Sequence, residues 1–268
     1  MPKKKNSESK RITNLIPSKE IEKDWTFNNA VEAEMLNAGP VAALPPSVDL
    51  RENWWTVGDQ GNTGACVGWA CAEGVLRWHF AKANRIANSQ SLSPRYIWMA
   101  SKEVDIFNTR PTTFIESEGT SLKDALDIAR KFGVIKDSVL PFNSGSLYQG
   151  SANTFYATAS LLKIASYFNL FKNTNDWKNW LATKGPLLVG LNVDSTWDNA
   201  AQTSGNLDVF QPNTVRGGHA VVVVGYQTNG RFIIRNSWGT NWGKNGFGFA
   251  TEQYIKDAFF NESYGVML

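Results

Sequence analysis

Apolar residues recur at helical spacing in the first half of the chain. Val67, Cys71, Val75 and Trp78 fall on one stripe, which predicts a helix that begins close to Cys66. The stretch "GNTGA" precedes this helix and has the composition of a turn. The first element of the pattern is therefore a buried helix entered through a glycine-bearing turn.

Two further helices are predicted from their capping residues. Ser93 followed by Pro94 is typical of a helix start. Ser121 begins the second helix, Asp124 follows three residues later, and Gly133 is a stop signal. The apolar face expected for this second helix consists of Leu122, Ala125, Leu126, Ala129 and Phe132.

The pattern changes in the second half of the chain, where short apolar segments are rich in β-branched and aromatic residues. Four of them, "GPLLVGLNV", "HAVVVVGY", "RFIIRNSW" and "GFGFAT", predict strands. Asn229-Gly230 between the second and third favours a hairpin. Helices followed by strands indicate an α+β protein with a helical lobe over roughly 55–150 and an antiparallel β-sheet lobe over roughly 155–268. The cleft between two such lobes is the natural ligand site.

The first 43 residues differ from the rest because they are polar and contain a single helical candidate, 28–39, closed by Gly39 and Pro40. We expect an N-terminal extension over 1–43 and one domain over 44–268. Residues 1–23 carry seven basic and three acidic side chains, a net charge of +4, so the remaining residues sum to −1 within the total of +3. A basic head on a near-neutral body is weak support for nucleic-acid binding, and we expect none.

Composition excludes several other classes. No apolar run approaches the roughly 20 residues of a membrane span. The basic head is followed by polar residues, so it does not resemble a secretory signal, and a cytoplasmic location and export by a signal-less route both stay open. We expect a monomer.

The chain has two cysteines and two histidines, Cys66, Cys71, His79 and His219. Two cysteines cannot form a disulfide framework, and five helical residues turn these side chains some 140° apart. No C-x-x-C or H-x-x-x-H spacing joins the four, so we expect neither a metal nor a cofactor. Cys71 lies on the apolar stripe and is expected in the core. Cys66 is expected at a helix N-terminus, which favours a thiolate.

A reactive cysteine needs a base. His79 lies too far along the helix, nearly 20 Å from Cys66, and is expected at the surface or its boundary. His219 opens a predicted strand, and Asn236 on the next strand could orient its ring while Trp238 covers the bond. A plain two-residue hairpin would place His219 opposite residue 240. The residues alone therefore leave a structural and a functional interpretation of this group open.

Four stretches together resemble the papain-like cysteine peptidases from about Leu44 to the C-terminus. They are "LPPSVDLRENW", "DQGNTGACVGWA", "GGHAVVVVGY" and "RNSWGTNWGKNGFGF", and they occur in family order at near-family spacing. The resemblance implies the two-lobed fold with the active-site cleft between its lobes. It also implies hydrolysis of peptide bonds through a thioester, by an endopeptidase as the default.

The resemblance implies a role for each matching residue. Cys66 is the nucleophile, His219 the acid and base, Asn236 its orienter, and Gln60 the oxyanion donor together with the Cys66 N–H. Gly119 matches a glycine that pairs with the substrate backbone, and Trp242 matches a tryptophan on the leaving-group side. The full set of expected substrate-binding residues is Gly119, Thr120, Ser121, Ala220, Trp238 and Trp242.

The sequence also departs from the family pattern. Thr63 stands where a disulfide-bonded cysteine is usual, Val67 where a tryptophan follows the nucleophile, and Gly218 where Asp or Asn precedes the histidine. These differences resemble the disulfide-poor microbial branch and indicate a microbial origin. Residues 12–43 are short for a family prosegment, and they are expected either to restrain activity at the cleft or to pack away from it. An acyltransferase or transglutaminase-type enzyme, and a non-catalytic papain-fold binding protein, stay open as alternatives.

Overall fold

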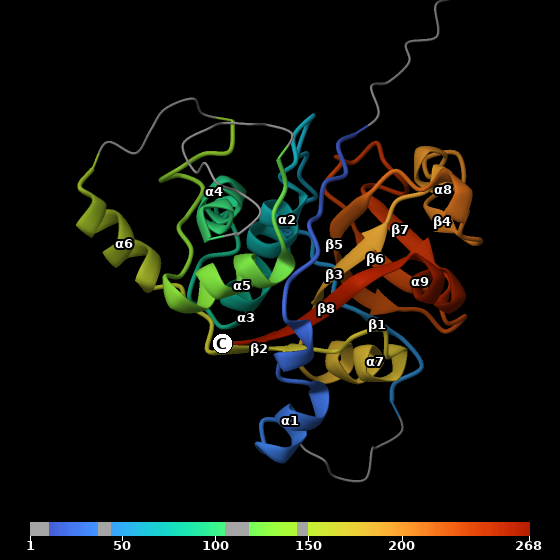
Figure 1. Cartoon of the computed structure of the whole chain (residues 1–268), viewed down its shortest axis with the longest axis horizontal. Helices are drawn as coiled ribbons and strands as arrows, with labels where there is room; N and C mark the ends of the chain where they lie inside the picture. Colours follow the sequence, from blue (N-terminus) through green and yellow to red (C-terminus); the bar gives the residue numbers. More distant parts are fainter. Residues whose placement is uncertain (1–10, 37–43, 105–117, 144–149) are drawn as a thin grey trace, which may run out of the picture.

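The computed structural model describes residues 11–36, 44–104, 118–143 and 150–268. The helices between residues 66 and 160 gather on one side of the molecule, the strands and the later helices lie on the other, and the N-terminal segment passes between them (Figure 1). This arrangement is the two-lobed α+β fold that the pattern predicted.

The helical lobe is built around a continuous helical stretch that begins at Cys66. Its parts are α2 (Cys66–Gly68), the π-helical η2 (Trp69–Leu76) and α3 (Arg77–Lys82). Two more helices, α4 (Pro94–Val104) and α5 (Leu122–Lys131), pack around it, and α6 (Ala152–Ser160) completes the lobe. The π-helical turn was not predicted, because periodicity does not distinguish it from an α-helix over so few residues.

The predicted capping residues are confirmed. Ser93 Oγ accepts from the Tyr96 N–H at 3.1 Å, and Ser121 Oγ accepts from the Asp124 N–H at 3.1 Å. Gly133 ends α5 at φ +96°, a conformation that favours glycine. The prediction for Phe132 was wrong: it lies past the last turn of α5 and is 45% exposed, because the helix stops at Lys131.

The β lobe is one sheet, in which the described strands follow the order β2-β8-β3-β5-β6-β7-β4, with β1 paired to β5. The strands are β1 (Val48–Asp49), β2 (Ser166–Asn169), β3 (Leu187–Asn192), β4 (Asn206–Leu207), β5 (Gly218–Tyr226), β6 (Phe232–Arg235), β7 (Phe247–Ala250) and β8 (Phe259–Met267). The pairs are antiparallel except β4 with β7, which is parallel. The helices of this lobe are α7 (Thr174–Thr183), α8 (Ser195–Asp198) and α9 (Glu252–Ala258), with a 3-10 turn, η3 (Pro212–Thr214).

The hairpin between β5 and β6 differs from the plain form. Gln227 N–H donates to Arg231 O at 2.8 Å across a longer turn, and the register shifts by one residue between Val223 and Gly225. Continued beyond the Val222↔Arg235 pair, this register brings residue 238, and not 240, opposite His219. The longer turn and the bulge each shift the register by one residue, and together they bring His219 closer to Asn236 than the simple hairpin predicted.

Strand β5 separates two hydrophobic cores. Val222 and Val224 face the core shared with the helical lobe, while Val221 and Val223 face the core beneath α7 and α9. Every residue of β5 is buried, which explains its continuous run of valines. His219 is the second residue of β5, and because β5 lies between the two cores, His219 lies at the junction between the lobes.

The described part of the N-terminal segment, from Arg11 to Leu36, contains η1 (Ile21–Lys23) and α1 (Phe27–Glu32). Thr26 caps α1 by accepting from the Asn29 N–H, and the helix ends earlier than the predicted 28–39. The stop signals at Gly39 and Pro40 lie outside the described residues. In Figure 1 this segment, drawn in blue, runs between the helices and the sheet.

Within the described residues, no helix is both long and apolar enough to cross a membrane. The same residues contain no cluster of three or more His, Cys, Asp or Glu side chains suited to a metal ion.

Candidate active site

Cys66 begins α2, as predicted, and its thiol is fully buried. Backbone amides of Ala220, Val67 and Asn14 hydrogen-bond to it. Burial raises the pKa of this thiol, and those hydrogen bonds oppose the rise. Cys71 lies in the core with a pKa raised by burial alone, and neither cysteine is in a disulfide.

His219 and Asn236 form a direct contact, with Nε2 of the imidazole 2.7 Å from Oδ1 of the amide. The Ser237 N–H also donates to Oδ1 at 2.8 Å, which identifies this atom as the acceptor. Nε2 therefore carries the hydrogen, and the lone pair of a neutral ring lies on Nδ1. Nδ1 has no hydrogen-bond partner in the part of the chain that the structure describes.

The His219 ring is enclosed by tryptophans. Trp238 lies with its ring centroid 4.8 Å away, and Trp197 of α8 meets the imidazole edge-on at 5.7 Å. Burial lowers the pKa of His219 to about 4, a shift that the Asn236 hydrogen bond opposes and the Arg216 charge reinforces. With the N-terminal segment in place, burial thus favours the neutral imidazole of His219 and the neutral thiol of Cys66.

Gln60 connects the two lobes at the site. Its Nε2 donates to Thr63 O at 2.8 Å and to Ile12 O at 3.4 Å. Its Oε1 accepts from Ser237 Oγ at 2.8 Å, and its backbone N–H donates to Ser237 O, also at 2.8 Å. The side-chain amide is therefore held between the Thr63 carbonyl and the Ile12 carbonyl of the N-terminal segment.

The expected substrate-binding residues divide into two groups. Gly119, Thr120 and Ala220 contact the N-terminal segment or the thiol: Thr120 O accepts from the Ile16 N–H at 3.1 Å, and a Cβ on Gly119 would lie 1.5 Å from Asn14 O. Ser121 caps α5 and donates to Asp124 at 2.6 Å, so its hydroxyl is used within the helix.

Trp238 and Trp242 lie on the other side of the site. Trp242 packs on Trp197 at 5.1 Å and donates its Nε1–H to Trp197 O at 2.9 Å. The tryptophans line a hollow of about 830 Å³ that Arg11, Asp59 and Arg216 also border. Arg11 pairs with Asp59 at 2.8 Å, and Arg216 donates to the Arg11 carbonyl at 2.9 Å.

Sequence reasoning missed Trp197, Ser237 and Arg216. Trp197 lies in a polar, Asn-rich stretch that indicates a surface loop or a short helix start, and only the placement of α8 brings it to His219. Ser237 could have been found as the neighbour of Asn236 in "RNSW". The prediction for His79 was wrong, because this residue is buried against Trp78, and burial lowers its pKa to about 4.

The cleft is filled by the N-terminal segment. Leu15 N–H donates to Gly218 O at 2.9 Å, and Thr13 Oγ donates to Arg216 O at 3.2 Å. The Leu15 side chain is buried and lies against Gly190. The segment therefore covers Cys66 from the tryptophan side, at Arg11, to the Gly119 side, at Asn14 and Ile16.

Comparison with known proteins agrees with this architecture. The family model described as papain family cysteine protease matches residues 44–259. A cathepsin L-like proteinase of Fasciola hepatica is 28% identical over 215 residues, which cover 76% of this chain and 60% of that protein. Cathepsin B-like CP2 of Giardia intestinalis is 30% identical over 238 residues, 82% of this chain and 72% of the relative.

Solved structures show the same fold. Xylellain, a cysteine protease from Xylella fastidiosa, superposes with a TM-score of 0.74 at 23% identity, covering 97% of each chain. The digestive procathepsin L2 proteinase of Tenebrio molitor gives a TM-score of 0.69 at 19% identity, covering 96% of this chain and 78% of that one. The fold and the matched family model define a thiol peptidase of the two-lobed class. The chain belongs to the papain family of cysteine proteases.

Proposed function

We propose that the domain over 44–268 hydrolyses peptide bonds through a thioester formed on Cys66, with His219 and Asn236 completing the triad. The observation that carries the proposal is the 2.7 Å contact between His219 Nε2 and Asn236 Oδ1. It leaves the Nδ1 lone pair for the Cys66 proton, and the Ala220 amide, next in the chain to His219, contacts that thiol.

The reaction follows from these positions. Nδ1 of His219 takes the thiol proton, and the thiolate attacks the substrate carbonyl carbon. The negative charge that develops on the carbonyl oxygen is stabilised by the Gln60 Nε2–H and the Cys66 N–H. His219 then gives its proton to the leaving amine, and afterwards removes one from the water that cleaves the thioester. Asn236 holds the ring in the required tautomer throughout.

Cleavage within a polypeptide, as by an endopeptidase, is the activity that the cleft supports best. The N-terminal segment passes over Cys66 as a continuous chain, with Arg11 on the Asp59 side and Ser18 beyond Thr120. A cleft that accepts a chain extending past the thiol in both directions suits cleavage within a polypeptide.

We also propose that the N-terminal segment restrains the enzyme. A substrate places its acyl part toward Gly119 and its leaving amine toward Trp242, so its chain runs from the first to the second. The segment runs the opposite way, from Arg11 near the tryptophans to Ile16 at Thr120. Its peptide groups are therefore reversed relative to a substrate, which supports occupation of the cleft without cleavage.

The decisive experiment measures cleavage of a peptide library by the full chain and by the chain lacking residues 1–43. Cys66→Ala should abolish cleavage, whereas Cys71→Ala, a change to the other buried cysteine, should retain it. The truncated chain should cleave faster than the full chain. Parent-rate cleavage by Cys66→Ala would refute the mechanism, and equal activity of the two chains would refute the restraint.

The alternatives have separate outcomes in the same preparation. Transfer of the acyl group from the thioester to an added amine, in preference to water, would indicate a transglutaminase-type enzyme. A protein that binds peptides, does not cleave them and is not labelled by an epoxysuccinyl inhibitor would be a binding protein.

A further inference from the structure

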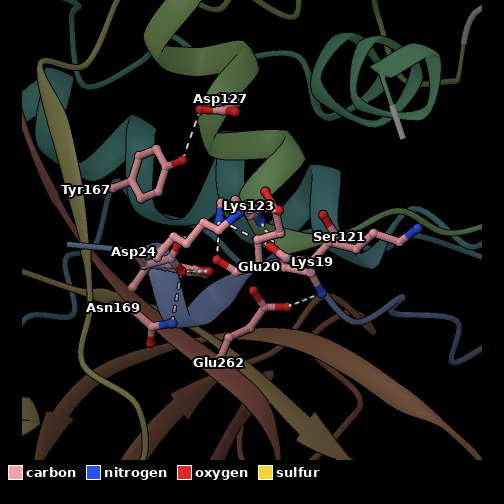
Figure 2. A network of polar contacts seen from close by, with 12 residues as sticks. Lys19, Glu20, Asp24, Ser121, Lys123, Asp127, Tyr167, Asn169 and Glu262 are labelled. Carbon is pink, nitrogen blue, oxygen red and sulfur yellow. Dashed lines mark hydrogen bonds and ion pairs between the residues drawn. The ribbon is translucent and has the colours of Figure 1, made fainter. Parts of the chain in front are cut away.

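The N-terminal segment makes a second set of contacts after it leaves the cleft, and these are polar. Figure 2 shows Lys19, Glu20 and Asp24 of the segment facing Lys123, Asn169 and Glu262. The last three belong to residues 44–268, called the body of the enzyme below. The contacts lie between α5, β2 and β8, away from Cys66, His219 and Gln60. They are not needed to fill the cleft.

Lys123 near the start of α5 is the main donor. Its Nζ donates to Lys19 O and Glu20 O, at 3.2 Å each, and pairs with Asp24 Oδ1 at 2.5 Å. Its backbone N–H donates to Ser18 Oγ at 3.1 Å. One residue of the body thus binds two carbonyls, a hydroxyl and a carboxylate of the segment.

Asp24 is the segment side chain that these contacts surround. Its Oδ2 accepts from Asn169 Nδ2 at 3.1 Å and from Tyr264 Oη at 2.7 Å. Its side chain is 2% exposed, and Asn169 and Tyr264 are fully buried. Three donors from three different elements therefore converge on one buried carboxylate, an arrangement in which charge-assisted hydrogen bonds are strong.

Glu262 of β8 binds the segment from the other side. Its Oε1 accepts from the Ser18 N–H at 3.0 Å, and the residue is fully buried. The Trp25 carbonyl adds a backbone contact by accepting from the Asn169 N–H at 2.7 Å. The body thus offers an acceptor for the first residue of this stretch and donors for its last residues.

We propose that Lys123, Asn169, Glu262 and Tyr264 form an anchor site for a carboxylate-bearing turn, whose occupant is Ser18–Trp25 of this chain, and that its occupation holds the Arg11–Ile16 stretch over Cys66. This inference rests on the proposed restraint of the enzyme by its N-terminal segment. It adds which contacts keep the segment in place and what chemistry they recognise.

The two sets of contacts are coupled through α5. Thr120 accepts from the Ile16 N–H in the cleft, and Lys123, three residues later, begins the anchor site. Ser121 between them caps the helix. On the segment side, Ser18 follows Ile16 by two residues. A turn released from Lys123 therefore frees the chain that follows Ile16. The cleft part is then held only by its own contacts, namely the backbone hydrogen bonds of Leu15 and Ile16, the buried Leu15 side chain and the bonds that residues 11–13 make.

Amide hydrogen exchange on the full chain tests the proposal, because it reports opening of the segment and does not depend on catalysis. Asp24→Asn removes the charge with little change in shape, and Lys123→Met removes the donor. Each should speed exchange of the Leu15 and Ile16 amides about tenfold or more, as expected for loss of a charged hydrogen-bonded partner. Lys131→Met is the matched control, because Lys131 lies on the same helix and pairs with Asp127 of the body. It should leave both amides unchanged.

The amides of Val221 to Val224 in β5 report global unfolding and should stay protected in every variant. Faster exchange confined to Ser18–Thr26, with Leu15 and Ile16 unchanged, would overturn the proposal, and so would an equal effect of Lys131→Met. If Lys123→Met also exposes β5, Asp24→Asn decides, because Asp24 lies outside the 44–268 domain. An inactive enzyme that shows the expected exchange would refute the peptidase proposal and leave the anchor site supported.

Discussion

Nε2 of His219 and Oδ1 of Asn236 lie 2.7 Å apart, on residues that two different segments of the sheet lobe bring together. The bond is buried, Trp238 covers the imidazole, and the Ser237 amide fixes the acceptor. This geometry selects one tautomer of His219 before any substrate arrives.

Asn236→Ala should therefore impair catalysis more than folding. Without Oδ1, the Nε2–H loses its partner and the ring its orientation, so kcat/KM should fall about 10²-fold, within the range of general acid–base effects. The measurement is kcat/KM across pH together with the melting temperature. Trp238→Phe keeps an aromatic cover over the same bond and serves as the comparison, with a smaller loss. An Asn236→Ala enzyme with an unchanged pH profile would argue against the orienting role.

Gln60→Ala should lower kcat about 10²–10³-fold with little change in KM, as expected when one oxyanion donor is lost. Ser237→Ala removes only the hydroxyl that donates to Gln60 Oε1 at 2.8 Å, so it should give a smaller loss of the same kind. Steady-state kinetics of both variants, in the full chain and in the chain lacking residues 1–43, check this order. Ser237→Ala losing more than Gln60→Ala would contradict it.

Leu15→Ala should open the cleft. Leu15 is buried against Gly190, and truncation of a buried leucine costs about 2 kcal/mol or more, which corresponds to roughly 30-fold more of the open form. The rate at which a thiol reagent modifies Cys66 measures the opening. Cys71 is an internal control: it lies in the core, so its modification would report unfolding instead. Unchanged modification of Cys66 would show that Leu15 does not hold the segment.

Glu262 should make stability depend on pH. Burial raises the pKa of Glu262 from an ordinary 4.5 to about 7, so the folded protein binds this proton more tightly than the unfolded chain does. Protonation of Glu262 therefore contributes to the free energy of unfolding. This contribution is fully present below pH 4.5 and is lost as pH rises toward 7, by about 3 kcal/mol in all.

Glu262→Gln keeps an acceptor for the Ser18 N–H and removes the titration. Between pH 5 and pH 8, the parent protein should therefore lose more of its free energy of unfolding than the variant does. Chemical denaturation at several pH values measures the difference. Identical slopes for the two proteins would contradict the shifted pKa.

Much of the fold could be predicted because its signals are local. The Ser93 and Ser121 caps, the Gly133 stop and the start of the helix at Cys66 depend on residues within one turn of each other. The four central strands were recognisable for the same reason. Phe132 was misplaced because periodicity continues past the residue at which the helix stops.

The candidate site was predictable only as far as its motifs extend along the chain. Cys66, Gln60, His219 and Asn236 were named from the sequence, and their catalytic roles stay a prediction. Whether His219 meets Asn236 depended on one bulge and a longer turn, which the Asn-Gly signal does not specify. Trp197 approaches His219 from α8, a short helix whose position in the fold the pattern does not specify.

The sequence by itself determined the helix starts, the strands and the candidate chemistry, because short-range hydrogen bonding and alternation of apolar residues specify these. The tertiary structure alone decided what covers Cys66 and how that cover is held. Asp24 meets Lys123, Asn169 and Tyr264 across as many as 240 residues of chain. Contacts between residues so far apart in the chain form only when the lobes pack, so no local sequence pattern could predict them.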